Sequence, residues 1–308
     1  MNSSKAKVAV SISLGSSSRD KRVETTLLDQ PVIVERIGTD GNTTRATALF
    51  TALDGKVDAL GVGGIDLWVE MEGKKYPLHA AHKLIRSVSQ TPVVDGSGLK
   101  NTLERDVVSS LVAALGDGYM QGRVLLTAAV DRYGMTQAFY DANYDVVCGD
   151  LMFALGLPLP IRTLANLKRL GRLLLPAIGR LPIRVLYPTG EQQDEVTPRF
   201  TKWYRWADVI AGDCHYIKRH MPDDLQDKVI VTNTTTPDDM SAFRQRGVRY
   251  VLTTTPRLQG RSFGTNMMEA ALTAISAKGR RLTNNELEQM LRGLELRPTV
   301  HDLQQESG

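Results

Sequence analysis

Short apolar runs alternate with helical patterns in the second half of the chain, and this alternation constrains the fold most. The first run, Arg123–Val130 (RVLLTAAV), is almost continuously apolar, which is typical of a strand buried on both faces of a sheet. Thr236-Pro237 and Thr283–Glu286 are typical helix starts. Strands that alternate with helices predict a parallel sheet. Further strands are expected at Tyr144–Cys148, Ile183–Tyr187, Asp208–Ala211, Lys228–Thr232 and Arg249–Thr253.

The first half of the chain predicts a separate α/β unit. A strand at Lys7–Ser13 precedes two alternating runs, Val23–Leu28 and Pro31–Ile37, which predict a hairpin. Gly116–Gly118 is typical of a domain boundary. We therefore expect an α/β protein of two domains. These are a substrate-type domain with hairpins over 1–117 and a Rossmann-like nucleotide-binding domain, a parallel sheet with flanking helices, over 118–280, followed by a C-terminal helix and tail over 281–308.

Composition narrows the classes of protein that fit. The 308 residues, 42% hydrophobic and 23% charged, are enough for two packed domains. The net charge of +4 is spread along the chain without an arginine-rich arm, so no nucleic-acid partner is expected. Two cysteines, Cys148 and Cys214, exclude a disulfide framework. With no signal-peptide pattern, this predicts a cytoplasmic protein, and a homo-oligomer, most simply a homodimer, is the default expectation.

Polar residues follow several predicted strands of the second domain. Ligands of open parallel sheets bind outside the carboxyl ends of the strands, so these residues predict a shared ligand cleft. An acid after the second strand, Asp150, is placed to hold a ribose hydroxyl and to favour NAD over NADP. The residues expected to contact a cofactor are Val130, Asp131, Arg132, Gly134, Asp150, Asn233, Thr234 and Thr235.

The loop after Val130 leaves the cofactor assignment open. It lacks the G-x-G-x-x-G fingerprint and has one glycine, Gly134, together with an acid, Asp131. A helix N-terminus with one glycine can still bind an anion, with Arg132 supplying positive charge. The alternative is an ordinary turn in which Asp131 caps the helix.

Two further loops predict contacts to a polar substrate. The segment Gly260–Asn266 places glycines, hydroxyls and an arginine before a helix, which is typical of an anion-binding loop, although a capped helix with solvated arginines fits the same residues. Serines follow the first strand and are expected to bind substrate hydroxyls. The expected substrate contacts are Ser16, Ser17, Ser18, Ser97, Arg257, Arg261, Thr265 and Asn266.

The loop Asp95–Lys100 (DGSGLK) brings an acid and a lysine beside glycine. Such a pair can relay a proton if burial and mutual charge tune the two pKa values. The alternative is a salt-bridged helix start. Cys214, His215 and His220 lack a second ligand cluster that would complete tetrahedral coordination, so no metal site is predicted.

A basic, leucine-rich segment spans Leu164–Arg184. A basic amphipathic helix of this kind can dock on a membrane or on an acidic carrier protein. Pro176 and Pro182 interrupt the segment, which favours the alternative of a helix packed on the sheet with a solvated cationic face.

Five segments resemble the bacterial quinate/shikimate 5-dehydrogenase-like proteins. They are GSGLKNTLER (Gly96–Arg105), VDRYGMTQAF (Val130–Phe139), GDLMFALGLP (Gly149–Pro158), AGDCHYIKRHMP (Ala211–Pro222) and TTTPRLQGRSFGTNMMEA (Thr253–Ala270). The resemblance implies a substrate domain, a nicotinamide-binding domain and proton transfer by Lys100 and Asp95. The glycine-rich turn of true shikimate dehydrogenases is missing after Val130.

The expected function is therefore an NAD(P)-dependent oxidoreductase, with NAD or NADP as cofactor, acting on a small polar, anionic hydroxy or keto substrate. One alternative is a non-redox sensor or carrier of a small anion or nucleotide. Another is a transferase or lyase that uses Lys100.

Overall fold

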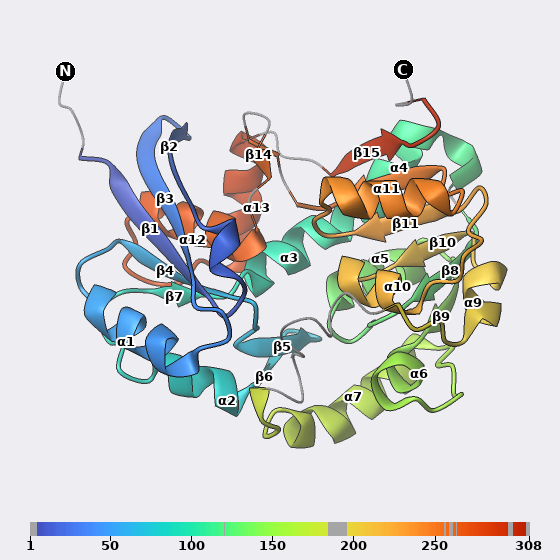
Figure 1. Cartoon of the computed structure of the whole chain (residues 1–308), viewed down its shortest axis with the longest axis horizontal. Coiled ribbons are helices and arrows are strands. Elements are labelled where there is room, and N and C mark those ends of the chain that lie inside the picture. The colour runs from blue at the N-terminus through green and yellow to red at the C-terminus, as the bar shows by residue number, and fades with distance from the viewer. Residues whose placement is uncertain are drawn as a thin grey trace. The chain divides into compact units, whose positions relative to one another are not determined.

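The computed structural model describes residues 5–119, 121–183, 196–255, 257–258, 261–262, 264–294 and 298–305. The chain forms two compact units (Figure 1). The first unit comprises Met1–Thr102, Leu174–Gly190 and Phe263–Leu296. The second unit comprises Leu103–Leu173, Glu191–Ser262 and Arg297–Gly308. Both units are α/β, and the expected fold class is confirmed.

The first unit is built on a five-stranded sheet of order β2-β3-β1-β4-β7. Strand β1 pairs in parallel with both β3 and β4, and β4 pairs in parallel with β7. The predicted hairpin is confirmed, because β2 pairs antiparallel with β3. The strands are β1 (Lys7–Ser13), β2 (Lys21–Leu27), β3 (Gln30–Gly38), β4 (Ala59–Gly63) and β7 (Val93–Val94), and a separate hairpin is formed by β5 (Trp68–Met71) and β6 (Lys74–Pro77).

Helix α12 packs on this sheet through glycines that leave room for its first turn. A β-carbon on Gly96, where φ is +89°, would lie 2.6 Å from the backbone nitrogen of Asn266. A β-carbon on Gly63 would lie 2.8 Å from Nδ2 of the same residue. The helices of this unit are α1 (Thr43–Leu53), α2 (His79–His82), α3 (Ser97–Leu103, whose last residue falls in the second unit), α12 (Thr265–Ser276) and α13 (Asn284–Gly293).

The second unit is built on a six-stranded sheet of order β15-β12-β11-β10-β8-β9. All of its pairings are parallel except that of β12 with β15. The parallel strands follow the doubly wound order 2-1-3-4-5, whose topological switch point lies between β8 and β10. The strands are β8 (Arg123–Leu126), β9 (Asp145–Cys148), β10 (Val209–Ala211), β11 (Val229–Thr232), β12 (Tyr250–Thr253) and β15 (Thr299–Asp302), and a short ribbon is formed by β13 (Arg257–Leu258) and β14 (Arg261–Ser262).

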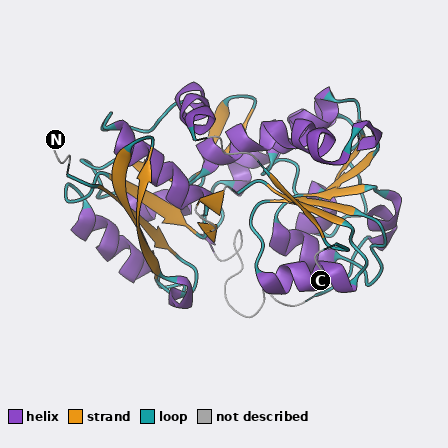
Figure 2. Ribbon diagram, turned by 90° about the horizontal axis from the view of Figure 1, so that it is seen from above, coloured by secondary structure: helices purple, strands orange, loops and turns teal. Residues whose placement is uncertain are grey.

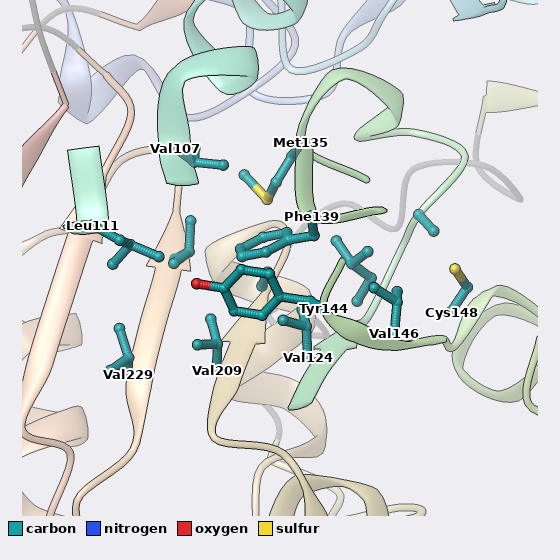
Figure 3. Close-up of a cluster of buried hydrophobic side chains, with 14 of the residues drawn as sticks. Val107, Leu111, Val124, Met135, Phe139, Tyr144, Val146, Cys148, Val209 and Val229 are labelled. Carbon is teal, nitrogen blue, oxygen red and sulfur yellow. The ribbon is translucent and has the colours of Figure 1, made fainter. Parts of the chain in front are cut away.

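Figure 2 shows the strands of the second unit between two layers of helices. Within β8, Val124 and Leu126 join one buried cluster and Leu125 joins the other, which explains the continuous apolar run. Figure 3 shows the first cluster, where the rings of Phe139 and Tyr144 meet edge to face with centroids 5.1 Å apart. The helices are α4 (Val107–Leu115), α5 (Tyr133–Asp141), α6 (Asp150–Leu155), α7 (Leu164–Ile178, which crosses the unit boundary), α9 (Thr201–Trp206), α10 (Cys214–His220) and α11 (Pro237–Gln245).

Several predicted bounds change in the structure. The predicted strand Arg123–Val130 ends at Leu126, because the amides of Ala129 and Val130 donate to the carboxylate of Asp150 instead of extending the strand. The predicted strand Ile183–Tyr187 lies outside the described residues except at Ile183. The compact units also interleave along the chain, whereas the predicted domains were continuous segments.

The basic, leucine-rich segment forms α7, with Pro176 inside the helix. This helix buries Leu167 and Leu175 and leaves Leu173 exposed. In the part of the chain that the structure describes, no helix is long and apolar enough to cross a bilayer. Docking of this segment to a membrane or to an acidic carrier stays a prediction.

The Gly96→Ala substitution is expected to lower the free energy of unfolding by about 3 kcal/mol, because it adds a left-handed backbone strain to a clash with α12. The matched control is Gly73→Ala, where φ is +72° and nothing lies within 4 Å, so only the strain of about 1 kcal/mol remains. Urea unfolding of both variants measures the difference. Equal losses would contradict the close packing of α12 on Gly96.

Candidate functional site

A buried arginine lies beside the switch point of the second unit. The side chain of Arg132, in the loop between β8 and α5, is 6% exposed. Its Nη1 lies 2.5 Å from Oε1 of Glu104, its Nη2 lies 3.0 Å from Oδ2 of Asp213, and its Nε lies 3.4 Å from Oδ2 of Asp131. The loops after β8 and β10 therefore meet through one guanidinium.

Asn233 extends this arrangement to the end of β11. Its Nδ2 donates to Oδ2 of Asp213 over 2.9 Å, and its Oδ1 accepts from the amide of Cys214. We call Glu104, Asp131, Arg132, Asp213 and Asn233 the Arg132 cluster. Beyond it, the hydroxyls of Thr234 and Thr255 lie 2.7 Å apart and connect the ends of β11 and β12.

Arg132 pairs with three carboxylates of the Arg132 cluster. Burial disfavours the charged guanidinium, but Glu104, Asp131 and Asp213 outweigh this cost and raise the pKa of Arg132. One fixed cation thus faces three carboxylates. The side chain of Glu104 is fully buried, whereas those of Asp131 and Asp213 are 35% and 23% exposed. The two partly exposed acids are the ones that a ligand can reach.

Asp150 holds the loop that presents Arg132. Its Oδ1 accepts from the amide of Val130 over 2.9 Å and its Oδ2 from the amide of Ala129 over 3.2 Å. Burial raises the pKa of Asp150 to about 6, against these hydrogen bonds. Both carboxylate oxygens serve the turn, and the expected ribose contact stays a prediction.

Two other predicted cofactor residues belong to segments that follow strands of the second unit's sheet. Gly134 is buried in the first turn of α5, and Thr235 directly precedes the cap of α11. Asp131 does not cap α5, because the cap position is Arg132 and no side chain closes it. The cluster also contains two acids that were not predicted. Asp213 follows β10 directly and the strand-end rule would have found it, whereas Glu104 comes from a helical segment without such a signal.

A second polar cluster lies in the first unit, around Asp95. This carboxylate accepts from the amide of Leu67 over 2.6 Å and from the amide and hydroxyl of Ser97 over 3.1 and 2.6 Å, and it pairs with Arg281 at 3.3 Å. Nζ of Lys100 lies 3.5 Å from Asp66. The described ion pairs therefore join Lys100 to Asp66 and Asp95 to Arg281, and the proton relay between Lys100 and Asp95 stays a prediction.

Glu269 is a buried acid beside the same cluster. Its Oε2 accepts from the amide of Leu99 over 3.1 Å, and its Oε1 lies 3.9 Å from Arg281. Burial and the neighbouring charge of Asp95 raise the pKa of Glu269 from 4.5 to about 7. This carboxyl therefore gains a proton near neutral pH.

The predicted substrate residues are divided between the units. Ser16, Ser17 and Ser18 form an exposed turn in the first unit, where the amide of Ser17 donates to Asp40. Thr265 and Asn266 begin α12, and Nδ2 of Asn266 donates to the hydroxyl of Ser11 over 2.5 Å. In the second unit, the described backbone places Arg257 and Arg261 in the β13–β14 ribbon. Substrate contact by these residues stays a prediction.

Comparison with protein families identifies the chain at the level of family. Residues 98–303 match the family described as a domain of unknown function, DUF8754. The chain belongs to the DUF8754 family. Residues 8–95 of this DUF8754 member match a second domain of unknown function, DUF8753. No protein of curated function has a significantly similar sequence.

Solved structures that match over nearly the whole chain share little sequence with this DUF8754 protein. GanP, a glucose-galactose binding protein from Geobacillus stearothermophilus, is 10% identical with a TM-score of 0.37, over 99% of this chain and 100% of GanP. A periplasmic solute-binding protein of an ABC transporter from Actinobacillus succinogenes 130z, with bound D-allose, is 12% identical with a TM-score of 0.35, over 98% and 99% of the two chains. The XylFII–LytSN complex matches with 12% identity, a TM-score of 0.35 and the same coverage.

The prediction of an NAD(P)-dependent oxidoreductase is corrected. The matched structures are described as sugar-binding and solute-binding proteins and give it no support. The geometry gives a physical reason as well, since the pyrophosphate of a dinucleotide at this edge would meet the carboxylates around Arg132. The resemblance of this DUF8754 member to quinate/shikimate 5-dehydrogenase-like proteins is not tested by these matches and stays a prediction.

The Arg132→Met substitution is expected to lower the free energy of unfolding by about 3–5 kcal/mol, because it removes the guanidinium that pairs with the buried carboxylate of Glu104. Adding Glu104→Gln to this variant removes that charge and recovers much of the loss. Urea unfolding of the two single variants and the double variant gives the interaction free energy between Arg132 and Glu104. Additive losses in this cycle would show that the two side chains are not coupled.

A second prediction concerns Glu269. The folded protein holds this proton more tightly than the unfolded chain, so its contribution to stability is complete below about pH 4.5 and is lost as the pH rises through about 7. The loss is at most about 3 kcal/mol. The Glu269→Gln variant keeps an acceptor for Leu99 and is expected to lose less stability than the wild type between pH 5 and pH 8 in urea unfolding.

The control for this pH dependence is Glu288→Gln, which removes a carboxylate from the surface and is expected to keep the wild-type profile. A profile of Glu269→Gln that coincides with those of the wild type and the control would contradict a raised pKa at Glu269.

Proposed function

We propose that this chain is a non-redox binding protein for a small, uncharged, hydroxyl-rich molecule such as a sugar or polyol. The ligand would lie at the carboxyl edge of the second unit's sheet. The observation that carries the proposal is the Arg132 cluster, which gathers acids, an amide and a guanidinium from four segments at the switch point. In doubly wound sheets this is the place where ligands bind.

The polar side chains at this edge carry hydrogen-bond donors and acceptors that can pair with the hydroxyl groups of a ligand. Carboxylates only accept hydrogen bonds, whereas amides and hydroxyls both donate and accept. Asp131 and Asp213 are partly exposed, and Asn233, Thr234 and Thr255 end or follow neighbouring strands. A molecule with several hydroxyls offers a donor to each carboxylate and an acceptor to each amide or hydroxyl.

The charge of the edge selects against anions. Arg132 already faces Glu104, Asp131 and Asp213, so its positive charge is shared among three carboxylates and is not left for a phosphate or carboxylate of a ligand. This argues for a neutral ligand in place of the anionic substrate expected from the sequence. It also argues against a nucleotide, whose phosphates would need the positive charge that the three acids neutralise.

Thermal unfolding of the full chain with a panel of neutral monosaccharides and polyols tests the proposal, with the corresponding sugar phosphates measured beside them. A neutral ligand at about 100 times its dissociation constant is expected to add about 2.7 kcal/mol of stability, visible as a rise in Tm. The phosphorylated partner of the same sugar is expected to give a smaller rise. Stabilisation by the phosphates alone would overturn the proposal.

Two variants locate the site. Asp131→Asn is expected to weaken binding of the stabilising sugar about tenfold, the effect of losing one hydrogen bond to a charged group. Asp145→Asn removes an exposed acid at the amino end of β9 in the same sheet and is expected to leave binding unchanged. Isothermal titration calorimetry compares the two. Equal affinities for both variants would place the ligand elsewhere.

A further inference from the structure

A cavity of about 580 Å³ lies within the first unit, away from the Asp95 cluster. Its walls are the first turns of α1, the segment from α2 to Leu84, and residues 180–183 that follow α7. The amide of His79 donates to the carbonyl of Gly179 over 2.8 Å and joins two of these walls. The volume is in the range of ordinary small-molecule sites.

The polar lining of this cavity is basic. Among the described residues that line it, His79, Lys83 and Arg180 are titratable and none is acidic. Within the described part of the chain, His79 and Lys83 form no ion pair. Arg180 donates from Nη1 to the carbonyl of Pro176 over 2.7 Å, and no other hydrogen bond of its guanidinium is seen among the described residues.

The rest of the lining combines hydroxyls with apolar groups. Thr43 and Thr44 carry hydroxyls that can orient an anion, and the amino end of α1 adds positive potential to that of the side chains. Leu181, which is 38% exposed, and Pro182 supply apolar surface. An inorganic ion would leave this apolar surface unfilled, so the lining suits a molecule with one anionic group and an apolar body.

We propose that this cavity binds a small organic anion, whose carboxylate or phosphate head is held by Lys83 and Arg180 and whose apolar body packs on Leu181 and Pro182. The proposal is independent of the proposed function, because its residues all belong to the first unit and the Arg132 cluster belongs to the second.

Isothermal titration calorimetry of the full chain tests this with two probes of the same shape, benzoate and the uncharged benzamide. We expect benzoate to bind about tenfold tighter or better, since charge-assisted hydrogen bonds are the stronger ones. Phenyl phosphate identifies the head group, and tighter binding of either anion than of benzamide supports the proposal. Equal affinity for benzamide, or no binding of either anion at 10 mM, overturns it.

Substitutions of residues that line the cavity test whether the anionic probe binds there. Lys83→Gln and Arg180→Gln are each expected to weaken the anion about tenfold and to leave benzamide unchanged, and both residues are exposed, so the fold is expected to persist. Lys56→Gln, at an exposed lysine outside the cavity, is the matched control and is expected to bind like the wild type. Unchanged anion binding in both cavity variants overturns the proposal. Asp131→Asn, which tests the second unit, is expected to leave anion binding unaffected.

Discussion

Because Arg132 is charged and almost wholly removed from water, the second unit can fold as observed only if carboxylates from other segments reach it. Glu104 reaches it from the segment that precedes α4, and Asp213 from the loop after β10. These contacts tie together the two strands that flank the switch point. Separating the ends of β8 and β10 would expose a buried charge without its partner, so the geometry of the edge and the stability of the unit are linked.

The loop that carries Arg132 depends in turn on a second buried carboxylate. Asp150, at the start of α6, accepts from the amides of Ala129 and Val130 and so ends β8 at Leu126. A longer strand would carry Arg132 away from Glu104. Burial raises the pKa of Asp150, although the hydrogen bonds from these two amides lower it. The position of the acid is therefore explained by the turn that it holds.

The elements of the fold were more predictable from the sequence than the contacts of the site. Continuous apolar strands and capping signals are local. The predicted helix starts at Thr236 and Thr283 are confirmed, and each is closed by a capping box. The rule that ligands bind outside the carboxyl ends of parallel strands is also local, and it pointed to Arg132 and Asn233. Glu104 is 28 residues before Arg132 and follows no strand, so its role depends on tertiary packing that no local pattern contains. The partners of Lys100 and Asp95 likewise come from distant segments.

The net charge of the chain hides an uneven local distribution. A value of +4 suggests one mildly basic protein that favours anions throughout. The second unit instead concentrates carboxylates around Arg132, whereas the described residues that line the cavity of the first unit include cations and no acid. Each unit therefore favours a ligand of different charge. Since the field at short range is set by the nearest groups, the local balance at each site, and not the total charge, decides what can bind there.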